Sequence, residues 1–188
     1  MMKIRTLLFV CIAAAAPLAL AAPTANTPST TTDKLSDVDM QIVAHLHAVD
    51  QLEIEMGKLA QQNGTAQVKT FGQMLVKDHT ALDNKVMAFA KKHKLTPIPA
   101  DASQSPAEKT DMDTQLGELK TLKGSAFDQK LLPMMEKAHD AELAKADANL
   151  AIANDADLKT MLEGVKPVLQ KHADEARKLQ QPVRSSQR

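Results

Sequence analysis

The sequence predicts an all-α fold: a ferritin-like four-helix bundle made of two antiparallel helical hairpins, with a long crossover that carries a short helix. Apolar residues recur at alternating spacings of three and four over four long stretches, which is the period of an amphipathic helix. Short turn sequences join the stretches in two pairs, and a longer Pro-containing segment separates the pairs. Trp and Tyr are absent and Phe occurs only four times, so the aromatic-rich strands of a β-sandwich or barrel are not expected.

The composition also narrows the classes of partner. The 188 residues carry 23 basic and 23 acidic side chains, and this balance provides no basic surface for duplex DNA. The scarcity of aromatic rings removes the stacking platforms that single-stranded nucleic acids require. We therefore expect one domain that does not bind nucleic acid.

Residues 1–21 have the pattern of a secretory signal peptide. A short basic region is followed by the apolar residues 6–16 and by the small-x-small sequence Ala19-Leu20-Ala21, which predicts cleavage after Ala21. The single cysteine, Cys11, lies in this segment, so the mature chain could form no disulfide. No second apolar stretch follows, and we expect an exported protein without a membrane span, either periplasmic or associated with the outer membrane.

The first predicted hairpin follows a flexible leader. Residues 22–36 are rich in Thr, Pro and Ser, with little to bury. The bundle domain is predicted over residues 37–180, and Ser36 with Asp39 three residues later resembles a capping box at its first helix. That helix ends at Asn63-Gly64, and the second runs over residues 65–92.

The crossover begins with a Pro-containing connection over residues 95–109. A short helix is predicted over residues 111–123, because four apolar residues fall on one of its sides. Gly124 is expected to end it, and Ser125 with Asp128 could cap the next helix.

The second hairpin is predicted from a third helix over residues 127–153 and a fourth over residues 157–180. Asn154-Asp155 forms the turn between them. Pro133 and Pro167 fall inside these helices and could kink them or delay their regular start. Residues 181–188 form a polar tail.

Histidines mark the inner faces of all four long helices. On helical wheels, His45, His79, His139 and His172 each lie inside the apolar arc of their own helix. Glu53 shares the arc of His45. At 1.5 Å per residue, His139 and His172 lie at nearly equal distances from the turn that joins their helices. Polar groups from all four helices are therefore expected to meet near mid-bundle.

Two interpretations of this inner cluster remain open, together with a third that extends the first. In one, the cluster is a metal site, with ligands His79, His139, His172 and Glu53 and with orienting partners Asp128, His45 and Glu136. In another, the histidines form a hydrogen-bonded network that only specifies packing. The third interpretation is a metal-dependent enzyme, which would need an open coordination position at the metal. The sequence contains no glycine-rich phosphate loop and no nucleophile elbow, and no catalytic residue is assigned.

The donor set indicates which metals would fit. Ferritin-like di-iron sites use two Glu-x-x-His elements, but here only Glu136 and His139 have that spacing, since Val76 and Leu169 precede the other two histidines. A di-iron centre is therefore not expected. A His-rich site suits zinc, copper or nickel better. The methionines could suggest Cu⁺ handling, although most fit helix faces as core residues.

The chain also resembles a bacterial family in several short segments. They are Glu53-Ile54, Gly57 to Ala60, Val68-Lys69, Met74 to Thr80, Leu122 to Gly124, Phe127-Asp128, His139 and Pro167 to His172. In spacing they are similar to the exported proteins known as domain of unknown function 4142, often labelled predicted outer membrane proteins. The resemblance covers roughly residues 37 to 180 and implies a ferritin-like bundle and export, but no mechanism. An envelope interaction or stress-response module, with an envelope protein or a second copy as partner, is the alternative function.

Overall fold

The computed structural model describes residues 34–103 and 105–181. The predicted signal peptide with its cleavage site after Ala21 lies outside these residues, as do most of the leader and most of the polar tail. Within the described part, every regular element is a helix. The five helices are α1 (Asp37–Asn63), α2 (Ala66–Lys92), α3 (Pro106–Thr121), α4 (Gly124–Ile152) and α5 (Ala156–Gln180).

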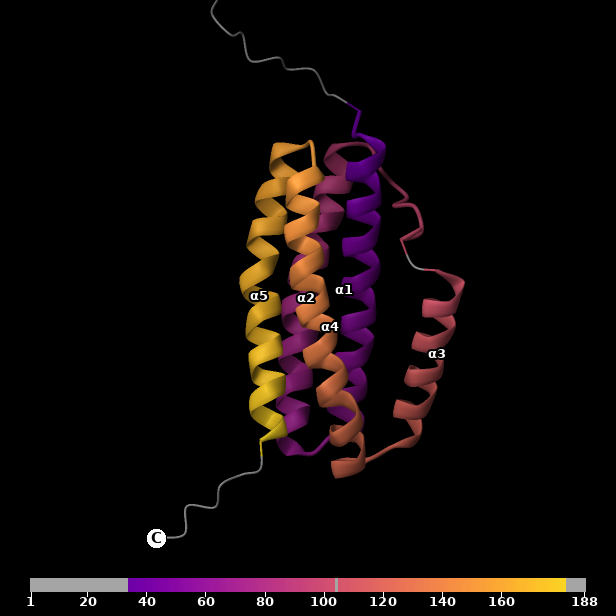
Figure 1. Cartoon of the computed structure of the whole chain (residues 1–188), viewed down its shortest axis with the longest axis vertical. Coiled ribbons are helices and arrows are strands. Elements are labelled where there is room, and N and C mark those ends of the chain that lie inside the picture. Colours follow the sequence, from indigo (N-terminus) through magenta and orange to yellow (C-terminus); the bar gives the residue numbers. More distant parts are fainter. Residues whose placement is uncertain (1–33, 104, 182–188) are drawn as a thin grey trace, which may run out of the picture. The chain divides into compact units, whose positions relative to one another are not determined.

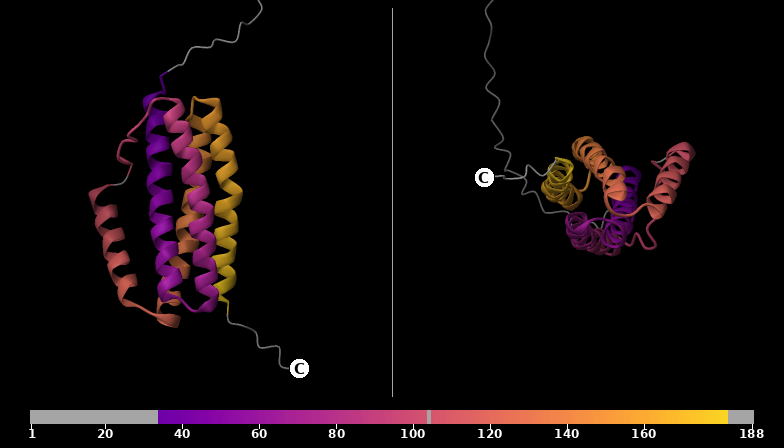
Figure 2. Two further views of the ribbon diagram at one scale, coloured as in Figure 1. Left: turned by 180° about the vertical axis from the view of Figure 1, so that it is seen from behind. Right: turned by 90° about the horizontal axis from the view of Figure 1, so that it is seen from below.

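The four long helices form a bundle of two hairpins, as the sequence predicts. The short turns pack α1 along α2 and α4 along α5, and contacts of α2 with α5 and of α1 with α4 join the hairpins. Figure 1 shows that α2 ends at the opposite end of the bundle from the start of α4. The crossover therefore runs along the bundle, and its helix α3 lies beside α1 (Figure 2). This single long connection is the ferritin-like type.

No helix that the structure describes is both long enough and apolar enough to span a bilayer.

Local sequence signals explain how the first hairpin is fixed to the second. Ser36 caps α1, with its Oγ accepting the Asp39 backbone N–H at 3.1 Å. The Asp39 carboxylate accepts both the Ser36 hydroxyl at 2.8 Å and the backbone N–H of Asn154 at 2.8 Å. The predicted cap is present, and it also ties the start of α1 to the turn between α4 and α5.

The structure corrects the predicted start of two helices. α3 begins at Pro106, five residues before the prediction, because proline suits a first helical turn in which its N–H is not needed. α4 begins at Gly124, whose φ of +57° is easily adopted without a Cβ. The predicted Ser125–Asp128 cap is wrong, since Lys123 occupies the cap position without a side-chain bond. Both inner prolines, in α4 and α5, lie within continuous helices.

A polar layer divides the apolar core into two main clusters. On α1, Asp50 and Glu53 lie between Val43 of one cluster and Met56 of the other. The same interruption occurs at one histidine on each of the other three long helices. One cluster lies toward the α1–α2 turn and contains Met56, Leu59, Val68, Phe71, Leu75, Phe127, Leu131 and Met135. The other lies toward the α4–α5 turn and contains Ile42, Val43, Val86, Phe89, Ala153, Leu158 and Leu162.

Candidate metal centre

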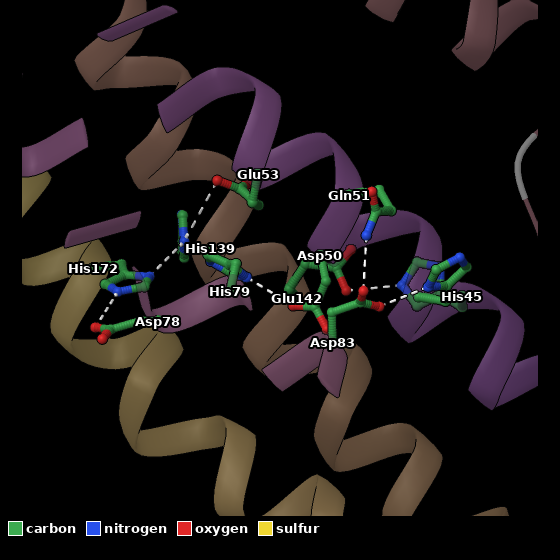
Figure 3. Close-up of polar contacts among 11 residues, drawn as sticks. His45, Asp50, Gln51, Glu53, Asp78, His79, Asp83, His139, Glu142 and His172 are labelled. Atoms are coloured by element: carbon green, nitrogen blue, oxygen red, sulfur yellow. Dashed lines mark hydrogen bonds and ion pairs between the residues drawn. The ribbon is translucent and has the colours of Figure 1, made fainter. Parts of the chain in front are cut away.

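Three histidines from three helices meet in the polar layer (Figure 3). His79 of α2, His139 of α4 and His172 of α5 each offer one ring nitrogen, and these nitrogens lie within 4.8 Å of one another. Their ring centroids are 5.1 to 5.8 Å apart. All three residues are at most 1% exposed. The structure thus brings together three of the four histidines that the helical wheels placed inward, and we refer to these three as the imidazole triad.

In each ring of the triad, one nitrogen is hydrogen-bonded to an oxygen of a neighbouring residue. His79 Nδ1 lies 2.8 Å from Asp50 Oδ1, and His172 Nε2 lies 3.1 Å from Asp78 Oδ2. His139 Nδ1 lies 2.8 Å from the backbone carbonyl of Met135. The Met135 carbonyl and the Asp78 carboxylate, whose pKa is held below its usual value, accept hydrogen bonds, so the facing nitrogens of His139 and His172 carry the proton. Asp50 accepts from His79 Nδ1 in the same way when its carboxylate is ionised. In a neutral imidazole the second nitrogen then presents a lone pair.

Two of these lone pairs face each other. His172 Nδ1 lies 3.2 Å from His139 Nε2, and both nitrogens are the ones left without a proton. Protonation of His172 would turn the contact into a hydrogen bond. However, burial lowers the pKa of His172 to about 4, against the opposing effect of its bond to Asp78. At neutral pH the His172 ring is therefore uncharged, and a cation between the two facing nitrogens would bind both lone pairs.

Glu53 of α1 supplies an oxygen on the same side of the triad. Its Oε2 lies 4.0 Å from His139 Nε2, and the residue is 5% exposed. Glu53 Oε2 and His79 Nε2 are buried and, among the described residues, have no hydrogen-bond partner. Each buried polar atom without a partner lowers the free energy of unfolding by about 1–3 kcal/mol. The four long helices thus each contribute one donor atom without a satisfactory partner.

The two carboxylates behind the triad have opposite electrostatic environments. Burial, with a smaller contribution from the charge of Asp83, raises the pKa of Asp50 to about 8. A cation next to His79 would oppose this shift, because it favours the ionised carboxylate. At Asp78, burial acts in the upward direction, but hydrogen bonds from Lys171 at 2.9 Å and from His172 hold the pKa below its usual value.

The predicted orienting residues lie elsewhere. Asp128 accepts the backbone N–H of Thr65 at 3.2 Å and also its hydroxyl, at the start of α2. It precedes His139 by eleven residues on one helix, which is about 16 Å of rise. Glu136 accepts Arg177 Nε at 3.0 Å on the partly exposed outer side of the bundle.

The third predicted partner, His45, is buried, but it bonds to Asp101 and Glu142 and not to the triad. The orienting partners that the structure provides are instead Asp50, Asp78 and the Met135 carbonyl. The wheels missed both carboxylates because each lies at the flank of an apolar arc and reaches the edge of a neighbouring helix. An acidic residue next in sequence to an inward-facing residue, such as Asp78 directly before His79, is the signal that could have revealed these carboxylates.

The comparisons with known proteins agree with the family resemblance. No curated protein and no solved structure matches the chain. A family model described as domain of unknown function (DUF4142) matches residues 24–179. This range contains the imidazole triad, Glu53 and the oxygens behind the rings. Because the match covers most of the sequence, the chain belongs to the family known as domain of unknown function 4142.

Proposed function

We propose that this protein binds one divalent transition metal ion in the polar layer of its bundle. The four proposed ligands, one from each long helix, are Glu53, His79, His139 and His172. The observation that carries the proposal is the 3.2 Å contact between two unprotonated ring nitrogens, His139 Nε2 and His172 Nδ1. A metal ion accepts both lone pairs, whereas an empty centre leaves them in repulsion.

The distances and outer partners support this assignment. Bonds of about 2.0–2.1 Å to a tetrahedral ion separate two nitrogen ligands by about 3.3 Å, close to the observed contact. Metal-bound histidines almost always donate their other N–H to a carboxylate or a carbonyl, which fixes the tautomer. Asp50, Asp78 and the Met135 carbonyl are placed for that role. Zinc, copper and nickel suit such a nitrogen-rich donor set.

Other functions have less support. A di-iron centre needs several carboxylate ligands, and Glu53 is the one carboxylate in the proposed set. A purely structural network, as in an envelope interaction module, leaves Glu53 Oε2 and His79 Nε2 buried without partners. Catalysis is not proposed, because four protein donors would fill a tetrahedral ion and leave no position for substrate.

The location of the protein forms part of the proposal. The signal-peptide pattern of residues 1–21, with cleavage after Ala21, supports export to the periplasm or the outer membrane. Cell fractionation followed by N-terminal sequencing of the mature protein would test it.

The proposed function is tested by metal analysis of untagged protein purified from its native compartment. Elemental analysis is expected to give close to one transition metal ion per chain for the wild type. The triple variant His79→Ala, His139→Ala, His172→Ala is expected to give almost none. As a control, His93→Ala changes a histidine near the end of the bundle and should keep its metal. Substoichiometric metal in both the wild type and the triple variant would contradict the proposal.

A further inference from the structure

The proposed metal centre is closed to solvent, so an ion needs a route of entry. A small cavity of about 20 Å³ lies beside it, large enough for one water molecule. His79 and Asp50 line the cavity on the side of the centre, while His45 and Glu142 form another part of its wall. The rest of the lining is largely apolar, with Leu46, Val49, Ala146, Leu162, Val165 and Leu169.

His45, which forms part of this wall, lies between the carboxylates of Asp101 and Glu142. Its Nδ1 lies 2.8 Å from Asp101 Oδ2, and its Nε2 lies 2.8 Å from Glu142 Oε2. Both ionised carboxylates accept, so both ring nitrogens must donate, and His45 is an imidazolium ion in this arrangement. We refer to His45, Asp101 and Glu142 as the His45 clasp.

The clasp connects three parts of the fold. His45 belongs to α1 and Glu142 to α4, while Asp101 lies in the crossover before α3. The beginning of the crossover is held separately, because Leu95 and Ile98 pack against an apolar cluster of the core. Asp101 also accepts the backbone N–H of Ser103 at 2.8 Å, which fixes its orientation toward His45. Loss of the clasp would therefore free Asp101 and Ser103 more than Leu95 and Ile98.

We propose that the His45 clasp is the gate of the metal centre, closed when His45 is protonated and open when it is neutral. This proposal rests on the proposed function. A neutral imidazole has one N–H, so one of the two carboxylates would then face a lone pair. Either Asp101 then moves away from His45, or Glu142 turns outward toward Lys145. The Lys145 Nζ lies 3.7 Å from Glu142 Oε1. Glu142 and His45 both line the cavity next to Asp50 and His79. Movement of Glu142 would open the wall directly, and movement of Asp101 would free the His45 ring to turn out of it.

The charges around His45 determine the pH range. Burial alone would lower its pKa, but Glu142 and then Asp101 raise the pKa above the usual value of 6.5, while the charge of Lys145 opposes them. Asp50 and His79 face it across the cavity. The stabilisation by a group with a raised pKa is complete below the unfolded value and disappears as pH rises through the folded value. The gate therefore opens toward alkaline pH.

Release of zinc to an excess of chelator tests this gate on the full mature chain. The wild-type release rate is expected to rise with pH, by up to about tenfold per pH unit below the folded pKa of His45. His45→Gln should release zinc rapidly at every pH, and His93→Gln, the matched control, should follow the wild type. Protonation of the ligands alone would give the opposite trend, with faster release at low pH. That trend in the wild type would overturn the gate.

Hydrogen exchange of the metal-free protein separates the gate from the metal site. After correction for intrinsic rates, the Ser103 amide, which donates to Asp101 Oδ1, should lose protection as pH rises, and His45→Gln should remove this dependence. Unchanged protection in both proteins would overturn the clasp itself. A pH-dependent clasp with pH-independent zinc release would overturn its role as a gate. A protein that binds no zinc contradicts the proposed function, and the exchange experiment still decides whether the clasp opens.

Discussion

The chemistry of the three inward histidines is set by single hydrogen bonds. A buried imidazole alone is an ordinary core residue, but an oxygen behind one nitrogen fixes which nitrogen keeps the lone pair. In this protein one nitrogen of each ring lies within 4.8 Å of the other two, and His139 Nε2 lies 4.0 Å from Glu53 Oε2. The proposal of a metal site therefore depends on Asp50, Asp78 and the Met135 carbonyl as much as on the rings.

Replacement of Asp78 tests this dependence. Asp78→Asn keeps an oxygen for His172 Nε2 but removes the charge, and metal affinity should fall by about 10- to 100-fold, as is usual for outer partners of a ligand. Competition with a chelator of known affinity measures the change. Asp147→Asn is the matched control, because Asp147 also pairs with a lysine of α5, Lys166, but contacts no triad residue. Equal affinities for Asp78→Asn and the control would contradict the role of Asp78.

The pairing of helices depends on a close contact between α1 and α2. A Cβ built at Gly72 would lie 2.5 Å from the carbonyl oxygen of Gly57, and one at Gly57 would lie 2.8 Å from that of Gly72. Both positions meet backbone atoms of the facing helix, which cannot move away easily. These glycines bring the two backbones together beside the polar layer, where Glu53 and His79 must approach.

Two glycine substitutions should therefore change stability in opposite directions. Gly72→Ala is expected to destabilise the protein by about 1–3 kcal/mol, since overpacking outweighs the better helix propensity of alanine. Gly164→Ala on α5, where nothing lies within 4 Å of the added Cβ, should stabilise it by about 0.5–1 kcal/mol. Urea unfolding followed by circular dichroism measures both. A Gly72→Ala protein as stable as Gly164→Ala would show that the contact is not tight.

The boundaries of the long helices were largely readable from local patterns. The cap at Ser36 and the turns at Asn63-Gly64 and Asn154-Asp155 are local signals, and the structure has helix ends at these places. The errors have tertiary causes. Asp128 looked like part of a cap for α4, yet it accepts from Thr65 of the other hairpin, and no spacing within α4 could reveal that partner.

The complete bundle places its polar layer between two apolar clusters. This arrangement costs stability when the layer is empty, because unpaired polar atoms and two facing lone pairs are buried at mid-bundle. A ligand that binds only the folded state stabilises that state by mass action and so offsets this cost. The bundle and its proposed metal are therefore expected to be thermodynamically linked.

Thermal unfolding with and without zinc measures this link. Free zinc at 100 times the dissociation constant should stabilise the wild type by about 2.7 kcal/mol, which corresponds to a rise in Tm of about 5–10 °C for a domain of this size. The triple His→Ala variant should show no rise. The same increase in both proteins would show that zinc acts outside the imidazole triad.

The sequence was sufficient for the helical fold and for the identity of the inward-facing histidines. Both follow from the 3.6-residue period, because a helix turns its side chains in a direction that depends on their position along that helix alone. The partners of those histidines depend on how far each helix is rotated and shifted against its neighbours, which the period of a single helix does not contain. For that reason Asp50 and Asp78 emerged as the oxygens behind the rings, Asp128 and Glu136 were found elsewhere, and His45 proved to hold the crossover.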